Sequence, residues 1–249
     1  MNKTAEDLKN GYYNSDYILD SEDLVNVFEK VFDIFVDANY QNDSTLFCSI
    51  HNSFNRGHNC IGCNLDSNNR RIENFLIQFK YFSDINLTFT SFILLLYLQV
   101  ECITEYFKII EIQERYRTKH FQVFTLIKRW ANFLKHPKAF MLVHHPNWSF
   151  ENRIFADAYV KKLYKNTNPT IDSSFINRYY NSDKNNKDLY RKLEKKEDLL
   201  VMFPDPIEII KDFTNAQIKF VELISENSIA RELLEDQTTI EKHFNQDLE

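Results

Sequence analysis

Glycine is almost absent from this sequence: three glycines occur among 249 residues, and proline occurs only five times. Sandwiches and barrels of β-strands need many tight turns, and the tightest of those turns depend on glycine. A chain of this length can also bury a substantial hydrophobic core. We therefore predict an all-α fold, built as a multi-helix bundle.

Apolar residues recur at intervals of three and four in several segments, the pattern of helices with one buried face. Helices are predicted over residues 21–40, 71–83, 87–117, 119–136, 150–165 and 207–234. The first half of 87–117 is apolar nearly all round, which indicates a central buried helix. Pro137 should end or kink the helix at 119–136, and the apolar run at 139–145 can be extended.

The sequence divides into four regions. Residues 1–20 are expected to be weakly ordered, and residues 21–165 to form a helical domain that includes a loop at 41–70. The stretch 166–187 is rich in Asn, Ser and Asp and is predicted to be a polar surface linker. Residues 188–249 are predicted to add C-terminal helices that pack on the domain or form an interface.

The sequence offers no sign of a targeting or membrane segment. Its first residues are polar and contain acids where a secretory signal needs an apolar core. The longest apolar run, residues 92–98, is about half of what a bilayer span requires. We therefore expect a cytoplasmic protein with no membrane partner and with reduced cysteines.

Three of the four cysteines fall within sixteen residues, in the segment CSIHNSFNRGHNCIGC. Its ligand-type residues form two pairs, each separated by two residues, and two such pairs complete a tetrahedral shell. We predict a structural Zn²⁺ with the ligands Cys48, His51, Cys60 and Cys63. His58 is the alternative to His51, and a reduced thiol pair with bystander histidines is the competing interpretation.

Two of the three glycines, Gly57 and Gly62, lie inside the same segment. A metal knuckle requires relaxed backbone angles, which glycine adopts readily. The glycines therefore favour a metal-stapled loop with an architectural role.

Residues 115–150 contain no Asp or Glu, although the whole chain carries a net charge of −6. The window holds seven Lys or Arg residues and four of the seven histidines. A positive stretch in an acidic protein is a candidate anion site, and we expect a phosphate backbone as its partner. The predicted RNA-binding residues are Arg115, Arg117, Lys119, His120, Lys128, Lys138, His144 and His145.

Arg129 and His136 lie seven residues apart, two turns of a helix, with Asn132 between them. On a continuous helix these side chains project within about a 60° sector. Histidine can take the proton of a ribose 2′-hydroxyl, and the guanidinium can stabilise charge on the phosphorane. One copy supplies a single acid–base group, so we expect a symmetric dimer. The competing interpretation is a cationic helix end stabilised by the macrodipole.

This segment resembles the R-x(4–6)-H motif of the HEPN superfamily, all-helical proteins that frequently act as ribonucleases in toxin–antitoxin and antiphage systems. Arg129-x6-His136 fits the long form, and Asn132 and Lys135 match polar residues often found inside it. The resemblance, over about residues 70–165, implies a metal-independent endoribonuclease. Its catalytic residues would be Arg129, Asn132, Lys135 and His136, and an antitoxin or sensor protein would be its partner.

The chain departs from the commonest motif at Trp130, where a polar residue usually follows the arginine. A second match, Arg115-x4-His120, ranks lower because its two side chains would lie about 140° apart on a helix, and a turn between helices at that point would reverse the ranking. The alternative function is a non-catalytic helical subunit that uses the basic window to bind nucleic acid or an acidic protein. A zinc-stabilised scaffold that recruits another protein is the third hypothesis.

Overall fold

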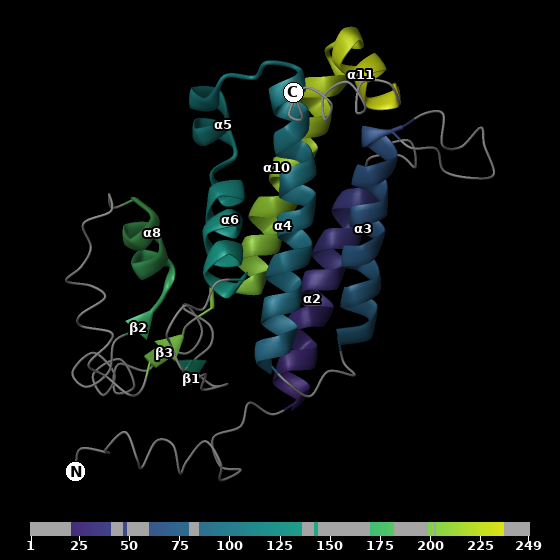
Figure 1. Ribbon diagram of the computed structural model, residues 1–249. Coiled ribbons are helices and arrows are strands. Elements are labelled where there is room, and N and C mark those ends of the chain that lie inside the picture. Colours follow the sequence, from purple (N-terminus) through teal and green to yellow (C-terminus); the bar gives the residue numbers. More distant parts are fainter. Residues whose placement is uncertain are drawn as a thin grey trace, which may run out of the picture.

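The computed structural model describes residues 21–40, 47–48, 60–79, 85–135, 142–143, 170–181, 199–201 and 203–236. Within these ranges the protein is an all-α multi-helix bundle with three very short strands attached to one side (Figure 1). The predicted fold class is confirmed.

The helices are α2 (Ser21–Tyr40), α3 (Ile61–Gln78), α4 (Ile85–Ile109), α5 (Glu114–His120), α6 (Gln122–Lys135), α8 (Ser173–Asn181), α10 (Pro206–Ser225) and α11 (Ser228–Glu235). The strands are β1 (Leu142–Val143), β2 (Thr170–Ile171) and β3 (Leu199–Val201). They form a parallel sheet in the order β1-β3-β2. β1 lies inside the apolar run that was expected to be extended.

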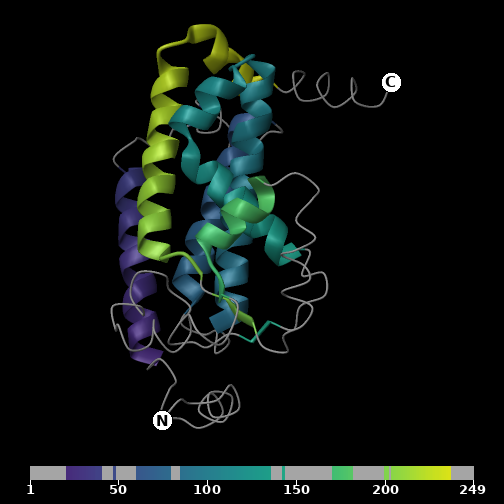
Figure 2. The same ribbon diagram turned by 90° about the vertical axis from the view of Figure 1, so that its left-hand side faces the viewer.

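Four long helices, α2, α3, α4 and α10, run alongside one another (Figures 1 and 2). The core between them is rich in aromatic side chains. Phe28 of α2 is fully buried, and its ring centroid lies 4.8 Å from that of Phe79 and 5.7 Å from those of Phe89 and Phe92. Edge-to-face and tilted ring pairs of this kind contribute beyond the area that they bury. The aromatic content of the sequence is therefore used in the core.

The C-terminal helices pack on the helical domain. α10 lies along α2, and its Phe220 ring meets Tyr106 and Phe107 of α4 at 5.6 and 5.4 Å. The hydroxyl of Tyr106 donates a hydrogen bond to the carbonyl of Ala230, which connects α4 to α11. Of the two predicted roles for residues 188–249, packing on the domain is therefore the one seen in the described residues.

A chain of buried amides crosses the core between α3, α4 and α10. Gln99 donates from Nε2 to Asn69 Oδ1 at 3.1 Å and to Gln217 Oε1 at 2.9 Å. Beside it, Asn68 donates to Cys102 Sγ at 3.2 Å. Buried amides need such partners because their desolvation is otherwise unfavourable.

The loop predicted at 41–70 is wrong for residues 61–70, because α3 begins at Ile61 rather than near Arg71. The first turns of α3 turn Asn68 and Asn69 inward, where they are 7% and 8% exposed. Asparagine is a polar residue and is expected at the surface or in a loop. The first half of α3 was therefore not predicted from the spacing of apolar residues.

The long helix predicted over 87–117 is broken, since α4 ends at Ile109 and α5 begins at Glu114. Glu111 adopts a left-handed φ of 57°, and the Ile112 amide donates back to Phe107 O at 2.9 Å. No glycine marks this turn in the sequence. α6 covers Gln122–Lys135, and the predicted stop before Pro137 lies outside the described residues.

The polar linker predicted at 166–187 is also wrong, because it contains β2 and α8. Asp172 accepts a hydrogen bond from the Phe175 amide at 2.6 Å and so begins the helix. Phe175 and Ile176 are buried, so this polar segment still has an apolar face. The residues predicted as a helix at 150–165 and as a weakly ordered terminus at 1–20 lie outside the described residues.

The last predicted helix, 207–234, consists of two helices. α10 ends at Ser225, and Asn227 caps α11 by accepting from the Ala230 amide at 3.1 Å. Asp205 caps α10 in the same way through the Ile207 amide, at 2.8 Å.

One described helix is long and apolar enough to cross a bilayer, the stretch Leu87–Ile109 of α4 with a mean hydropathy of 1.6. In the bundle this helix packs against α3 and α6. Its Phe92, Leu96 and Val100 side chains are almost fully buried. Because the core of the protein explains its apolar character, the length and composition of α4 are weak evidence for a membrane span.

Candidate functional site

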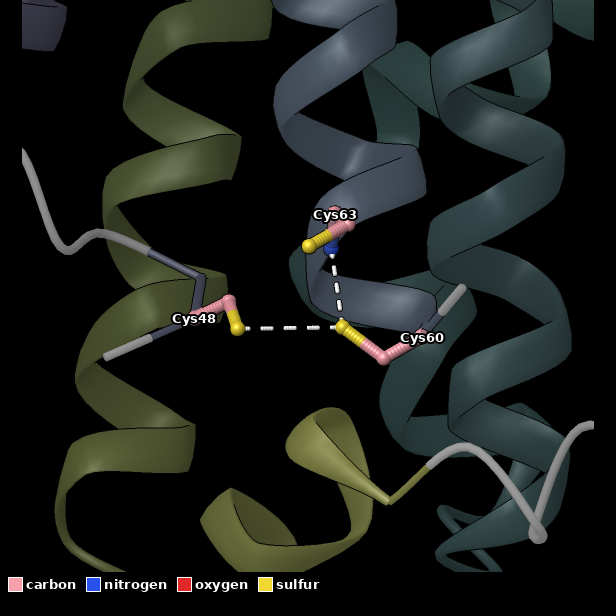
Figure 3. Close-up of side chains that lie close together, drawn as sticks. All are labelled: Cys48, Cys60 and Cys63. Atoms are coloured by element: carbon pink, nitrogen blue, oxygen red, sulfur yellow. Dashed lines mark hydrogen bonds between the residues drawn. The ribbon is translucent and has the colours of Figure 1, made fainter. Parts of the chain in front are cut away.

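Three cysteine thiols converge at the start of α3 (Figure 3). The sulfur atoms of Cys48, Cys60 and Cys63 all lie within 4.8 Å of one another, and all three residues are buried. The Cys48 and Cys60 sulfurs are 3.7 Å apart. Tetrahedral Zn²⁺ with Zn–S bonds of about 2.3 Å places its sulfur ligands about 3.8 Å apart. The three thiols can therefore hold a metal ion.

The spacing of Cys60 and Cys63 works because a helix begins between them. Cys60 is the N-cap of α3, with extended backbone angles, and its sulfur accepts a hydrogen bond from the Cys63 amide at 3.2 Å. Helix N-termini leave such amides without an intrahelical partner. A deprotonated Cys60 would accept this bond more strongly, so the same geometry favours a metal-bound thiolate.

Gly62 brings the third thiol into place. A Cβ added at this residue would lie 2.2 Å from the carbonyl oxygen of Phe47 and 3.0 Å from the Cβ of Cys48. Residues 47–48 therefore cross the start of α3 at a distance that only glycine permits. The expectation of relaxed backbone angles is wrong for Gly62, which is helical; its role is to allow close approach.

Burial raises the pKa of the Cys60 thiol, and the neighbouring Cys48 and Cys63 raise it further. Three buried thiolates without a counter-ion are strongly disfavoured, whereas a bound divalent cation compensates their charge. His51, His58 and Gly57 lie outside the described residues. Three of the four predicted metal ligands are thus brought together.

The cations of the basic window spread over different sides of α5 and α6. Lys128 of α6 forms an ion pair with Glu101 of α4, at 2.8 Å. Lys135 lies 3.8 Å from the centroid of the Tyr97 ring, also on α4. The basic window contains no acidic residue in the sequence, but in the folded protein the Glu101 carboxylate of α4 lies beside it. These two lysines of the basic window therefore both contact α4.

Arg117 and Lys128 line a small hollow of about 160 Å³ on the side of α6 that faces α4, together with Glu114. The Nε atom of Arg117 is buried and has no hydrogen-bond partner among the described residues. Arg115 is exposed on α5. None of these three predicted RNA-binding residues lines either of the two larger hollows described next.

Arg129 faces a different and larger hollow, of about 400 Å³, between α6, α8 and α10. The guanidinium is half-buried, and its Nη1 donates to Asn177 Oδ1 of α8 at 2.6 Å. Asp212 of α10 also lines this hollow. The arginine is therefore held in a defined orientation at an open site.

A second hollow of about 410 Å³ adjoins the first and shares Gln122, Val123 and Asp212 with it. It contains Lys119 and His120 from α5 and Lys219 from α10. We call these two adjoining hollows, around Arg129 and around His120, the basic groove. Lys119, His120 and Arg129 are the residues of the predicted site that it brings together.

In the basic groove the Nζ of Lys219 lies 2.9 Å from Nδ1 of His120. The Tyr116 ring supports the imidazole from the other side, with its centroid 4.3 Å away. Burial lowers the pKa of His120 below its ordinary value of 6.5, and the charges of Lys219 and Lys119 lower it further. The lowered pKa favours the neutral imidazole, whose Nδ1 can accept a hydrogen bond from the Lys219 ammonium.

The predicted catalytic set is described only in part. Arg129 and Asn132 are half-buried on α6, three residues apart and therefore on one side of the helix, and Lys135 is exposed at its end. Trp130 is fully buried, and its Nε1 donates to Ser173 Oγ at 3.2 Å. His136, Lys138, His144 and His145 lie outside the described residues.

Sequence reasoning missed Asn177, Asp212 and Lys219. Asn177 lies 48 residues from the arginine that it contacts, and Lys219 lies 99 residues from His120. Neither belongs to a local motif, and Asn177 falls in the segment predicted to be a linker. Only the packing of α8 and α10 against α6 assigns them to the site.

In comparisons with protein-family models, curated proteins and solved structures, the chain matched none of them.

Proposed function

We propose that this protein is a metal-independent endoribonuclease of HEPN type. The observation that carries the proposal is Arg129, which an amide from α8 orients at an open groove. It lies on α6, which is described as far as Lys135, and His136 is the next residue in the sequence. An arginine oriented in this way can hold a scissile phosphate.

In the proposed reaction His136 accepts the proton of a ribose 2′-hydroxyl as its oxygen attacks phosphorus. The bond from phosphorus to the 5′-oxygen breaks, which leaves a 2′,3′-cyclic phosphate and a 5′-hydroxyl. Arg129 stabilises the negative charge that gathers on the phosphorane oxygens, and Asn132 and Lys135 assist. The leaving oxygen needs a proton, which His136 of a second copy of this chain supplies in a symmetric dimer.

We place this activity in the cytoplasm of a prokaryote, as the effector of an antiphage defence or toxin–antitoxin system. An antitoxin or sensor protein would then control it. The support for this setting is the resemblance of Arg129-x6-His136 to the HEPN motif.

The second candidate function is a non-catalytic helical subunit that binds nucleic acid in the same groove. Two observations favour it. Trp130 fills a core position beside Arg129, where the family usually has a polar residue, and the exposed Asp212 carboxylate faces the groove. A carboxylate close to the scissile phosphate would oppose charge stabilisation by the arginine.

The metal at the thiol cluster is proposed to be a structural Zn²⁺. Cys48, Cys60 and Cys63 supply three ligands, and His51 or His58 supplies the fourth, which closes the coordination shell. Zinc would fix the segment around residue 48 on the start of α3. It takes no part in the proposed cleavage.

The test is cleavage of total RNA by purified protein in buffer without added divalent metal. Wild type should cleave, and both Arg129→Ala and His136→Ala should lower the rate at least about 100-fold, the usual effect of removing a group that stabilises transition-state charge. Arg231→Ala is the matched control, because Arg231 is exposed on α11. RNA that is bound but never cleaved by wild type would establish the second candidate instead.

Expression in bacteria gives an independent readout. Wild type should slow growth if it cleaves cellular RNA, and Arg129→Ala should restore growth. Toxicity that survives Arg129→Ala at equal protein level would contradict the nuclease proposal.

A further inference from the structure

We infer that the basic groove binds single-stranded RNA through two phosphate positions, with a ribose hydroxyl read between them. Arg129 would contact one phosphate and the His120–Lys219 pair the next, while Asp212 accepts a hydrogen bond from the 2′-hydroxyl. The choice of RNA as the ligand rests on the proposed function. The two-position geometry rests on residues from α5, α6, α8 and α10.

The two hollows form one continuous groove. The hollows around Arg129 and His120 have the size of ligand sites, about 400 Å³ each, and they share Gln122, Val123 and Asp212. His120 lies two residues before Gln122, near the start of α6, and Arg129 lies seven residues beyond Gln122, which corresponds to a helical rise of about 10 Å. The two cationic ends are therefore separate positions along one wall rather than one crowded site.

Lys219 and His120 make an unusual contact in this groove. Two groups that can both be cationic lie 2.9 Å apart, with Lys119 lining the same hollow. Among the described residues, Lys219 forms no ion pair with a carboxylate. A bound phosphate would supply a negative charge, accept from the ammonium and from the imidazole N–H, and favour the charged form of both groups.

Asp212 is the acidic residue of the basic groove. This carboxylate is exposed, lines both hollows and forms no ion pair with a described residue. It would repel a phosphate placed directly beside it, so phosphates are favoured at the two ends of the groove. Between them it can accept a hydrogen bond from a sugar hydroxyl. The 2′-hydroxyl distinguishes RNA from DNA, so Asp212 would select RNA.

The experiment compares binding of a short single-stranded RNA and a DNA of the same sequence, by fluorescence anisotropy over a range of salt concentrations. Lys219→Gln should weaken RNA binding several-fold and reduce the log–log salt slope by about 0.7, the value for one phosphate contact on a single strand. Lys211→Gln is the charge-matched control, since Lys211 is exposed on α10 and lines neither hollow.

Asp212→Asn tests the sugar contact. It should reduce the preference for RNA over DNA, mainly because DNA binds more tightly once the repulsive charge is removed. Glu222→Gln, exposed on the same helix, should leave that preference unchanged. Circular dichroism of each variant confirms that the bundle is intact.

The outcomes separate this inference from the proposed function. If Lys219→Gln and Lys211→Gln bind RNA equally well, the two-position geometry is wrong while Arg129 and cleavage are unaffected. Equal affinity of wild type for RNA and DNA would remove the role of Asp212 and so overturn the inference. If wild type neither binds nor cleaves RNA, both proposals fall.

Discussion

The thiol cluster and the basic groove are built in opposite ways. The thiols come from sixteen consecutive residues, are buried, and meet around the first turn of a single helix. The groove is open and takes its side chains from four helices, with contacts between residues 48 and 99 positions apart. The thiol cluster depends on local backbone geometry, whereas the groove depends on how α8 and α10 pack against α5 and α6.

This difference determines how each region should respond to change. A buried site with one helix-cap hydrogen bond, one sulfur–sulfur contact and one close backbone approach has little freedom to adjust, so a change of a single atom can disrupt it. An open groove can lose one cation and keep its shape. We therefore expect large, structural effects from the thiol cluster and graded, electrostatic effects from the groove.

Cys60→Ser should have the largest effect, because Cys60 is a ligand of the proposed metal and the partner of Cys48, while serine can still cap α3. Metal content should fall from one equivalent of zinc to less than about half, and the melting temperature should drop with it, since metal binding contributes directly to folding. Elemental analysis and thermal unfolding measure the two effects. Cys102→Ser is the control, and it should retain the metal.

Gly62→Ala should destabilise the protein by roughly 2 kcal/mol, in the range for an overpacked core site. The added methyl group meets the Phe47 carbonyl at 2.2 Å, and backbone cannot rotate away as a side chain can. Urea unfolding measures the loss. Asn64→Ala, at an exposed position of α3, is the comparison and should change stability little. A Gly62→Ala protein as stable as wild type would show that residues 47–48 do not rest on α3.

His120 should show the smallest effect. Its pKa is lowered in the folded state by burial and by Lys219 and Lys119, with the Asp212 carboxylate in the same hollow. The unfolded chain therefore binds the proton first as pH falls, so this group makes folding slightly less favourable from about pH 6.5 down to the lowered pKa. Lys219→Met should raise the pKa of His120, as followed by NMR titration of the imidazole. An unchanged pKa would place Lys219 too far from the ring.

Much of the fold follows from the sequence where the governing physics is local. The lack of glycine predicts helices, and the periodicity at 21–40 correctly predicts α2. Boundaries failed where a residue behaved against its type. Glu111 adopts a left-handed turn without being glycine, and Asn68 and Asn69 turn inward.

The site shows the same division. Cys60 and Cys63 lie at the start of the same helix, so their proximity could be predicted from their spacing. Cys48 reaches them because Gly62 lets residues 47–48 pass close to that helix. Partners that depend on helix packing could not be predicted. Asn177, Asp212 and Lys219 have ordinary sequence surroundings, and only the tertiary arrangement makes them part of the groove.

The buried amides of Asn69, Gln99 and Gln217 have a further consequence for α4. An apolar helix as uniform as this one could slide along its neighbours by a full turn and still bury leucines against leucines. Such a shift would separate each amide from its partner in the buried core. Each polar group left without a hydrogen bond there would destabilise the fold by about 1–3 kcal/mol. The three amides thus allow α4 only one position along its own axis. Because α4 packs against α6, that position also determines where α6 places Arg129.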